Sequence, residues 1–281
     1  MILVAAAGFG TLAIFGKFAE DVGLNTTTLL TFRFLIATIA IWTGLVLWRR
    51  ARLLPTSKRR TAIALGLVYA AFSALFFWGL LFIPAGIAGL AFYTYPIYVY
   101  VIAVLFLDEL LTRRKLGALV LALSGVGFIV GGDAAGVDVF GVALVLGAAL
   151  GYAIYITGNS AALDSIEADL LAGTAMLATT VAWVVFGGVS GRLFVPTGTD
   201  QWLVILGIAI VGTAVPIFLY VSGLDRIPAS NASVLSTVEP VVTVLLGIAL
   251  LGEQVTLVLA VGGILILGGV GLIQSELGSG S

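Results

Sequence analysis

The sequence contains no cysteine and no histidine, and it has few charges, with 13 basic and 14 acidic residues among 281. Without cysteine or histidine the chain cannot build a disulfide, a thiolate nucleophile, a Ser-His-Asp triad or a His/Cys zinc site. A net charge of −1 provides no basic surface for a nucleic acid. We therefore expect no metal, no cofactor, no nucleic-acid partner and no enzymatic activity.

Hydrophobic residues make up 61% of the chain, and charged residues only 10%. An ordinary soluble domain is about 45–50% apolar and about 25% charged. A soluble chain of this length could not bury so much apolar surface and keep a wettable exterior. The composition predicts an all-α integral membrane protein that crosses the bilayer several times.

Ten segments are apolar for about the 20 residues that a helix needs to cross a bilayer. They are residues 2–19, 27–48, 62–83, 87–107, 115–131, 139–158, 169–188, 202–223, 229–251 and 255–273. The connections between them are short, so no separate extramembrane domain is predicted.

The basic residues fall almost entirely in alternate loops. If the N-terminus is cytoplasmic, Arg192 is the one basic residue of the outside loops, and the inside loops hold ten. These ten are Arg49, Arg50, Arg52, Lys58, Arg59, Arg60, Arg113, Arg114, Lys115 and Arg226. Because cytoplasmic loops are enriched in lysine and arginine, we expect both termini to be cytoplasmic.

The chain matches itself at an offset of 144 residues. Ile83-Pro84-Ala85 falls on Ile227-Pro228-Ala229, Pro96 falls on Pro240, and 16 of the 52 positions in 79–130 are identical. Five spans separate the copies, and an odd number places the second copy upside down in the membrane. We expect two inverted five-helix repeats, 1–131 and 139–274, around a central cavity, with 275–281 as a tail outside the fold.

These features resemble those of a known family. Arg33-Phe34, Pro96 and Glu239-Pro240 lie in three of the expected spans, and Glu109 and Glu253 follow the fourth and ninth. With ten spans from a five-span duplication, the chain resembles the EamA-type branch of the drug/metabolite transporter superfamily, most closely the YddG-type aromatic amino acid exporters of bacteria. The resemblance implies an exporter of amino acids and related metabolites in the inner membrane.

Glu239 lies near the middle of its expected span, where a charge costs several kcal/mol. It can bind a substrate ammonium or a coupling proton. Alternatively it is the N-cap of a half-helix whose first residue is Pro240. Pro96 lies at the equivalent depth, where a kink can free carbonyl groups for a substrate or can serve packing alone.

Two basic residues lie inside the expected spans. Lys17 is near the outer end of the first span, where it can reach the interface or pair with Glu20. Arg33 is deeper and has two open interpretations, a structural pair with Glu239 or a contact with a substrate carboxylate. Glu239, Arg33 and Lys17 are therefore the candidates for coupling or charge pairing.

Aromatic residues give the best indication of the substrate. Their rings suit an apolar or aromatic side chain and can hold an ammonium by cation–π contact, although each can equally be a packing residue. The spacing places Tyr93 and Tyr100 on the face of Pro96. Together with Pro96 and Glu239, the predicted substrate-binding residues are Tyr93, Tyr100, Tyr152, Tyr155, Asn159, Trp78 and Tyr220.

The sequence thus predicts a secondary transporter, possible as a monomer, that exports amino acids with aromatic or apolar side chains by alternating access. The alternatives are a transporter of another small amphipathic solute, such as a drug cation, a sugar or a nucleotide metabolite, and an intramembrane lipid-modifying enzyme. The enzyme lacks support, because the sequence has no Asp-rich motif and its loops are too short for a catalytic site.

Overall fold

The computed structural model describes residues 1–106, 113–131, 137–163, 165–224, 236 and 238–277. Several sequence features lie outside these described residues. They are Glu109, Arg226, Ile227-Pro228-Ala229 and the last residues of the tail, 278–281.

Every regular element within the described ranges is a helix. The first half of the chain contains α1 (Ile2–Gly10), α2 (Leu12–Asp21), α3 (Thr26–Leu47), α4 (Thr56–Gly79), α5 (Ala85–Phe92), α6 (Tyr95–Phe106) and α7 (Arg113–Gly131). The second contains α8 (Val139–Leu163), α9 (Ala168–Ser190), α10 (Thr199–Ala209), the π-helix η1 (Ile210–Ala214), α11 (Val215–Leu224), α13 (Val238–Leu251) and α14 (Leu257–Leu277).

Six of the helical segments are long and apolar enough to cross a membrane. They are Ile2–Asp21, Thr26–Leu47, Thr56–Gly79, Val139–Leu163, Ala168–Ser190 and Thr199–Ile217, and shorter apolar helices cover Ala85–Val99, Leu116–Val130, Val238–Leu251 and Leu257–Leu272. A chain that crosses lipid must satisfy its backbone hydrogen bonds internally, which explains the all-helical build. The ten expected spans match these positions, and their number and inverted arrangement stay predictions.

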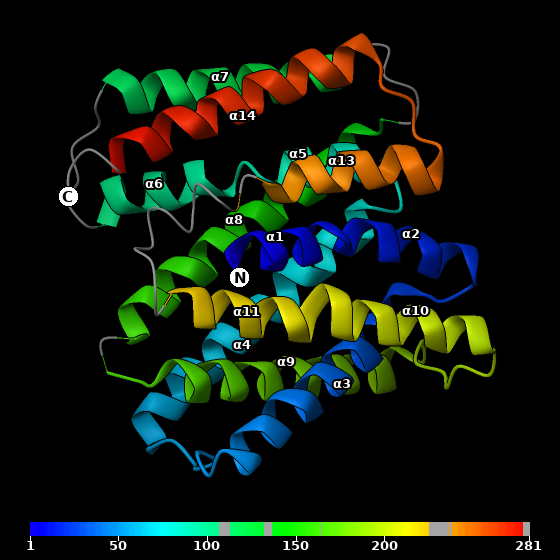
Figure 1. The fold of residues 1–281 in the computed structure, drawn as a ribbon, viewed down its shortest axis with the longest axis vertical. Helices are drawn as coiled ribbons and strands as arrows, with labels where there is room; N and C mark the ends of the chain where they lie inside the picture. The colour runs from blue at the N-terminus through cyan, green and yellow to red at the C-terminus, as the bar shows by residue number, and fades with distance from the viewer. Residues whose placement is uncertain (107–112, 132–136, 164, 225–235, 237, 278–281) are drawn as a thin grey trace.

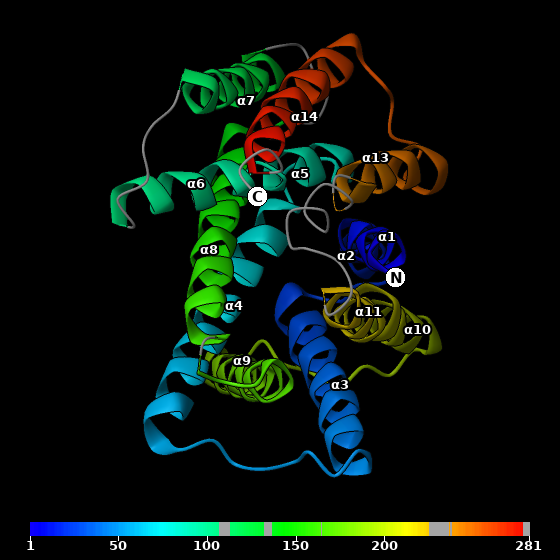
Figure 2. The ribbon, with the colours of Figure 1, turned by 60° about the vertical axis from the view of Figure 1, so that its left-hand side comes forward.

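The molecule is elongated, and a pair of packed helices lies at each of its ends (Figure 1). At one end α7 and α14 lie side by side, and at the other α3 packs against α9. The helices α4 and α8 run along each other between these ends (Figure 2). The candidate functional site described below lies where α3, α4, α5, α6 and α8 approach one another.

Small residues allow the α7–α14 pair to approach closely. A Cβ added to Gly125 of α7 would lie 2.7 Å from the Gly262 carbonyl oxygen of α14. A Cβ on Gly269 would lie 2.6 Å from the Ala118 carbonyl oxygen. Close backbone approach through small residues is how helices commonly associate in lipid, where no hydrophobic force drives them together.

Glu253 joins the two halves of the chain at the start of α5. Its carboxylate accepts a hydrogen bond from the Ala85 N–H and another, at 2.9 Å, from the Gly86 N–H. Both N–H groups belong to the first turn of α5, where no partner exists inside the helix. A residue that the sequence singled out only as a repeat match therefore caps a helix of the other half.

Candidate functional site

Several helices break near the middle of their spans, at polar residues. The break between α1 and α2 is at Thr11, whose hydroxyl donates to the Gly8 carbonyl at 2.6 Å. The break between α5 and α6 follows the same pattern, with the Thr94 hydroxyl donating to the Ala91 carbonyl at 2.7 Å. Each hydroxyl satisfies a carbonyl at the end of the first half-helix.

The span formed by α10 and α11 is interrupted by the π-helix Ile210–Ala214. The Thr213 hydroxyl donates to the Ile208 carbonyl at 2.8 Å within this turn. π-helical turns are rare and occur frequently at functional sites.

These interruptions contact one another. The Thr243 hydroxyl of α13 donates to the Gly10 carbonyl at 2.8 Å, beside the break at Thr11. A Cβ on Gly10 would lie 2.7 Å from the Glu239 carbonyl oxygen. Irregular backbone inside a membrane is tolerated where it is buried in protein or lines a cavity, so the break region is a candidate for the transport pathway.

A cluster of aromatic rings lies beside the breaks. The Tyr69 and Tyr155 rings stack with centroids 5.1 Å apart, and the Tyr95 and Tyr152 rings meet edge to face at 4.7 Å. We call eight neighbouring rings the aromatic cluster. They are Phe34, Tyr69, Phe72, Phe76, Phe92, Tyr95, Tyr152 and Tyr155, and the rings of Phe77 and Tyr93 contact this cluster at Phe76 and Tyr95.

Glu239 lies near this cluster. It is close enough to Tyr69, Tyr95, Tyr152 and Tyr220 to interact with them electrostatically. Among the described residues no hydrogen bond or ion pair to its carboxylate is found. A carboxylate within a membrane helix that lacks a protein partner is a candidate for a substrate or ion pathway.

The start of α13 differs by one residue from the capping alternative for Glu239. That alternative made Glu239 the N-cap and Pro240 the first helical residue, but α13 begins at Val238. Glu239 and Pro240 therefore both lie in the first turn. An acidic side chain in this turn is favoured by the helix dipole, so the structural role of Glu239 is compatible with a functional one.

Arg33 is 2% exposed and does not pair with Glu239 in this structure. Its Nε instead donates to the Thr213 hydroxyl of the π-helix at 2.9 Å. Its guanidinium carbon lies 4.8 Å from the Phe34 ring centre and 5.4 Å from that of Phe77. The expected structural pair is thus replaced by a neutral partner and aromatic faces.

Lys17 has a structural environment. Its ammonium donates to the Leu80 carbonyl and lies 3.6 Å from the Glu20 carboxylate, the partner expected from the sequence. Both contacts hold Lys17 at the ends of α2 and α4, away from the aromatic cluster.

The structure brings only some of the expected aromatic residues together. Tyr152 and Tyr155 are in the aromatic cluster, and the Asn159 side chain donates to the Tyr155 carbonyl at 2.7 Å. Pro96 is buried in the first turn of α6, and the Tyr220 ring meets Phe9 at 6.3 Å. The Tyr100 side chain lies outside the described residues.

Trp78 points elsewhere, whereas Tyr93 contacts the aromatic cluster at its edge. Tyr93 is fully buried, its ring meets that of Tyr95 edge to face at 5.5 Å, and it also packs with Ala118, Ala122 and Val270 of α7 and α14. Trp78 contacts Phe186 of α9 at 6.2 Å. The face shared by Tyr93 and Pro96 was predicted from a continuous helix, and the break at Tyr93–Thr94 changes the direction in which the side chains that follow it point.

Sequence reasoning did not single out Tyr69 or Phe92. One signal for Tyr69 was present, since residues 69, 72 and 76 share one face of α4 and Trp78 does not. No local signal indicated Thr213, because its role depends on the π-helical turn.

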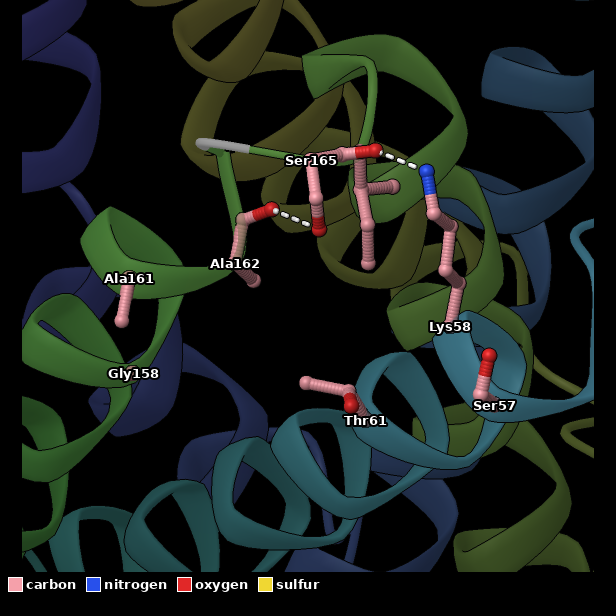
Figure 3. Close-up of a pocket in the computed structure, with 8 residues that line it drawn as sticks. Ser57, Lys58, Thr61, Gly158, Ala161, Ala162 and Ser165 are labelled. Atoms are coloured by element: carbon pink, nitrogen blue, oxygen red, sulfur yellow. Dashed lines mark hydrogen bonds between the residues drawn. The ribbon is translucent and has the colours of Figure 1, made fainter.

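A cavity lies at the start of α4 (Figure 3). Its volume is about 390 Å³, and Lys58 at its edge donates to the Ser165 carbonyl. It is lined by Ser57, Lys58, Thr61, Gly158, Ala161, Ala162, Ser165 and Ile166. On α4 its lining residue Thr61 is about 12 Å along the helix from Tyr69, whereas on α8 Gly158 is one turn from Tyr155 of the aromatic cluster.

Comparison with known proteins bears on the whole chain. The EamA-like transporter family matches residues 1–131 and 139–275. The chain belongs to the EamA-like transporter family. This confirms the resemblance to the drug/metabolite transporter superfamily and makes the chain a multi-pass membrane transporter with a small-molecule substrate.

Two relatives and one solved structure are similar to this EamA-family chain over most of its length. It is 29% identical over 237 residues to the threonine/homoserine exporter RhtA of Salmonella typhimurium, covering 79% of this chain and 71% of RhtA. It is 29% identical to an uncharacterized transporter of Archaeoglobus fulgidus, covering 89% of each. A solved crystal structure with 20% identity has the same fold, with a TM-score of 0.70 over 96% of this chain and 94% of the other.

Proposed function

We infer that this protein exports amino acids and related small metabolites across the bacterial inner membrane. The observation that carries the inference is the Glu239 carboxylate, which has no protein partner in the described part of the chain and faces the aromatic cluster beside the helix breaks. The RhtA relative is named as a threonine and homoserine exporter, which supports amino acids as the class. The preference for aromatic or apolar side chains is proposed from the cluster.

We propose that transport proceeds by alternating access of two inverted halves. In support, α7 and α14 begin at Arg113 and Leu257, which are equivalent positions of the 144-residue repeat. These two helices run in opposite directions, as do α6 and α13 (Figure 1). Inverted repeats with broken helices at the site are the usual build of secondary transporters.

Uptake of radiolabelled amino acids into proteoliposomes tests the function. Threonine, phenylalanine, tryptophan, leucine and glutamate are compared, with and without a pH gradient. We expect saturable flux of amino acids, reduced at least about tenfold by Glu239→Gln if the carboxylate contacts the substrate or a coupling proton.

Asp200→Asn is the matched control, because Asp200 is exposed in the first turn of α10, away from the cluster. Its flux should equal that of the unmodified protein. Absence of flux for every amino acid in folded protein contradicts the proposed substrate class. Normal flux by folded Glu239→Gln removes Glu239 from the transport step.

A further inference from the structure

The broken-helix region contains two opposite charges that are not partnered with each other. Arg33 comes from the first half of the chain and Glu239 from the second. The Arg33 guanidinium carbon lies 4.8 Å from the ring centre of Phe34, whose ring is 5.3 Å from that of Tyr69, and both charges interact electrostatically with Tyr69. Arg33 is buried and Glu239 is half-buried, and they form no ion pair within the described residues. Charges inside a membrane protein are normally paired, so two unpaired ones near one aromatic cluster fit a ligand that carries both complementary charges.

The contacts of Arg33 leave its terminal amino groups available. Only Nε has a hydrogen-bond acceptor among the described residues, the Thr213 hydroxyl. The Phe34 and Phe77 rings attract the cation but are not hydrogen-bond acceptors of the usual kind. A guanidinium with free amino groups matches the two oxygens of a carboxylate.

The surroundings of Glu239 fit an ammonium group. Its carboxylate has no donor within the described ranges, and it interacts electrostatically with Tyr95, Tyr152 and Tyr220. A carboxylate and aromatic faces together bind an organic cation. The Tyr95 and Tyr152 rings beside it offer apolar surface to whatever carries that cation.

We propose that Arg33 and Glu239 form a two-point clamp for the zwitterion of an α-amino acid. The substrate carboxylate binds Arg33, its ammonium binds Glu239, and the side chain rests on the aromatic cluster. The clamp deepens the proposed function, on which it rests, by requiring both free ends of the amino acid. Bound substrate brings each of the two charges its opposite, so the loaded site is electrically balanced.

Competition among substrate analogues tests the clamp in the unmodified protein. Uptake of labelled threonine into proteoliposomes is measured against unlabelled threonine, threonine amide and N-acetylthreonine. The amide lacks the carboxylate and the acetyl compound lacks the ammonium. We expect each analogue to compete at least about tenfold more weakly than threonine, because each leaves one buried charge without a partner.

Variants assign each end of the substrate to a residue. Glu239→Gln should weaken the binding of threonine and threonine amide but leave the binding of N-acetylthreonine unchanged. Arg33→Gln should weaken the binding of threonine and N-acetylthreonine but leave the binding of threonine amide unchanged. If Arg33→Gln does not fold, Arg33→Lys takes its place. Arg33→Lys keeps the charge without the planar guanidinium fork, so it should weaken the binding of threonine and N-acetylthreonine, but by less than the loss expected for Arg33→Gln.

The outcomes separate the clamp from the function. If threonine and the other amino acids are not transported by folded protein, the proposed function fails. If threonine is transported and both analogues compete as well as threonine does, the clamp is overturned and the function stands. If the variants weaken all three compounds equally, Arg33 and Glu239 support the fold and the clamp is likewise overturned.

Discussion

At the residue scale, identity alone does not tell a binding aromatic from a packing one. Tyr69 and Trp78 lie on the same helix, α4, yet Tyr69 joins the aromatic cluster and Trp78 turns toward Phe186 of α9. The difference is the direction of the side chain around the helix. Tyr93 and Tyr95 show the same dependence, since Tyr95 contacts Tyr152 while Tyr93 packs against α7 and α14 and meets the cluster at Tyr95.

Leucine substitutions on α4 test this distinction. Tyr69→Leu removes the ring that stacks on Tyr155 and interacts with both charges, and we expect the half-saturating substrate concentration to rise about tenfold. Trp78→Leu should change it by less than about twofold, because this residue touches none of the charges. Proteoliposome flux over a concentration series measures both, and equal effects would contradict the assignment of Tyr69.

At the element scale, helix contacts depend on small residues and on capped helix ends. Gly268 and Gly269 are neighbours in α14 and have opposite surroundings. An added Cβ at Gly268 meets nothing within 4 Å, whereas at Gly269 it meets the Ala118 carbonyl oxygen of α7. Two adjacent alanine substitutions therefore isolate the packing of this helix pair.

We expect Gly269→Ala to lower the midpoint of thermal unfolding in detergent, since the clash is with backbone that cannot rotate away. The cost of such overpacking is about 1–3 kcal/mol. Gly268→Ala should be neutral or slightly stabilising, because alanine restricts the unfolded chain. The same loss in both variants would show that the α7–α14 contact is not as close as described.

The Glu253 cap is the second element-scale test. Glu253→Ala leaves the Ala85 and Gly86 N–H groups without their acceptor and should cost about 1–3 kcal/mol. Glu167→Ala breaks an exposed ion pair with Arg52 and should cost at most about 1 kcal/mol. Thermal unfolding followed by tryptophan fluorescence compares the two, and equal losses would contradict the cap.

At the scale of the whole molecule, the distribution of basic residues fixes the expected orientation. The exposed residues Thr56, at the start of α4, and Thr197, in the loop before α10, lie at helix ends that we expect on opposite sides of the membrane. Because the chain has no cysteine, a single introduced cysteine reports its own location.

We expect Thr197→Cys to react with a membrane-impermeant maleimide in intact cells. Thr56→Cys should react only after the membrane is opened. Labelling of both residues from one side would contradict the inverted repeat, and labelling with the two sides exchanged would contradict the cytoplasmic termini.

The sequence by itself determined the class of protein and the positions of its helices. Both follow from composition and from apolar runs, which are local properties of the sequence. An apolar run of about 20 residues is stable in the bilayer as a helix whatever the rest of the chain does. The excluded chemistries also follow from residue counts alone, and so does the candidacy of Glu239, since a carboxylate in an apolar run is costly wherever it points.

Only the tertiary structure decided which side chains meet. A helix break at Thr94 and a π-helical turn at Thr213 change the direction of the side chains that follow them. A helical wheel drawn through either interruption therefore assigns those side chains to the wrong face. Arg33 consequently binds Thr213, which is distant in sequence, and leaves Glu239 facing the tyrosines. Such contacts depend on how whole helices pack, and no local pattern encodes them.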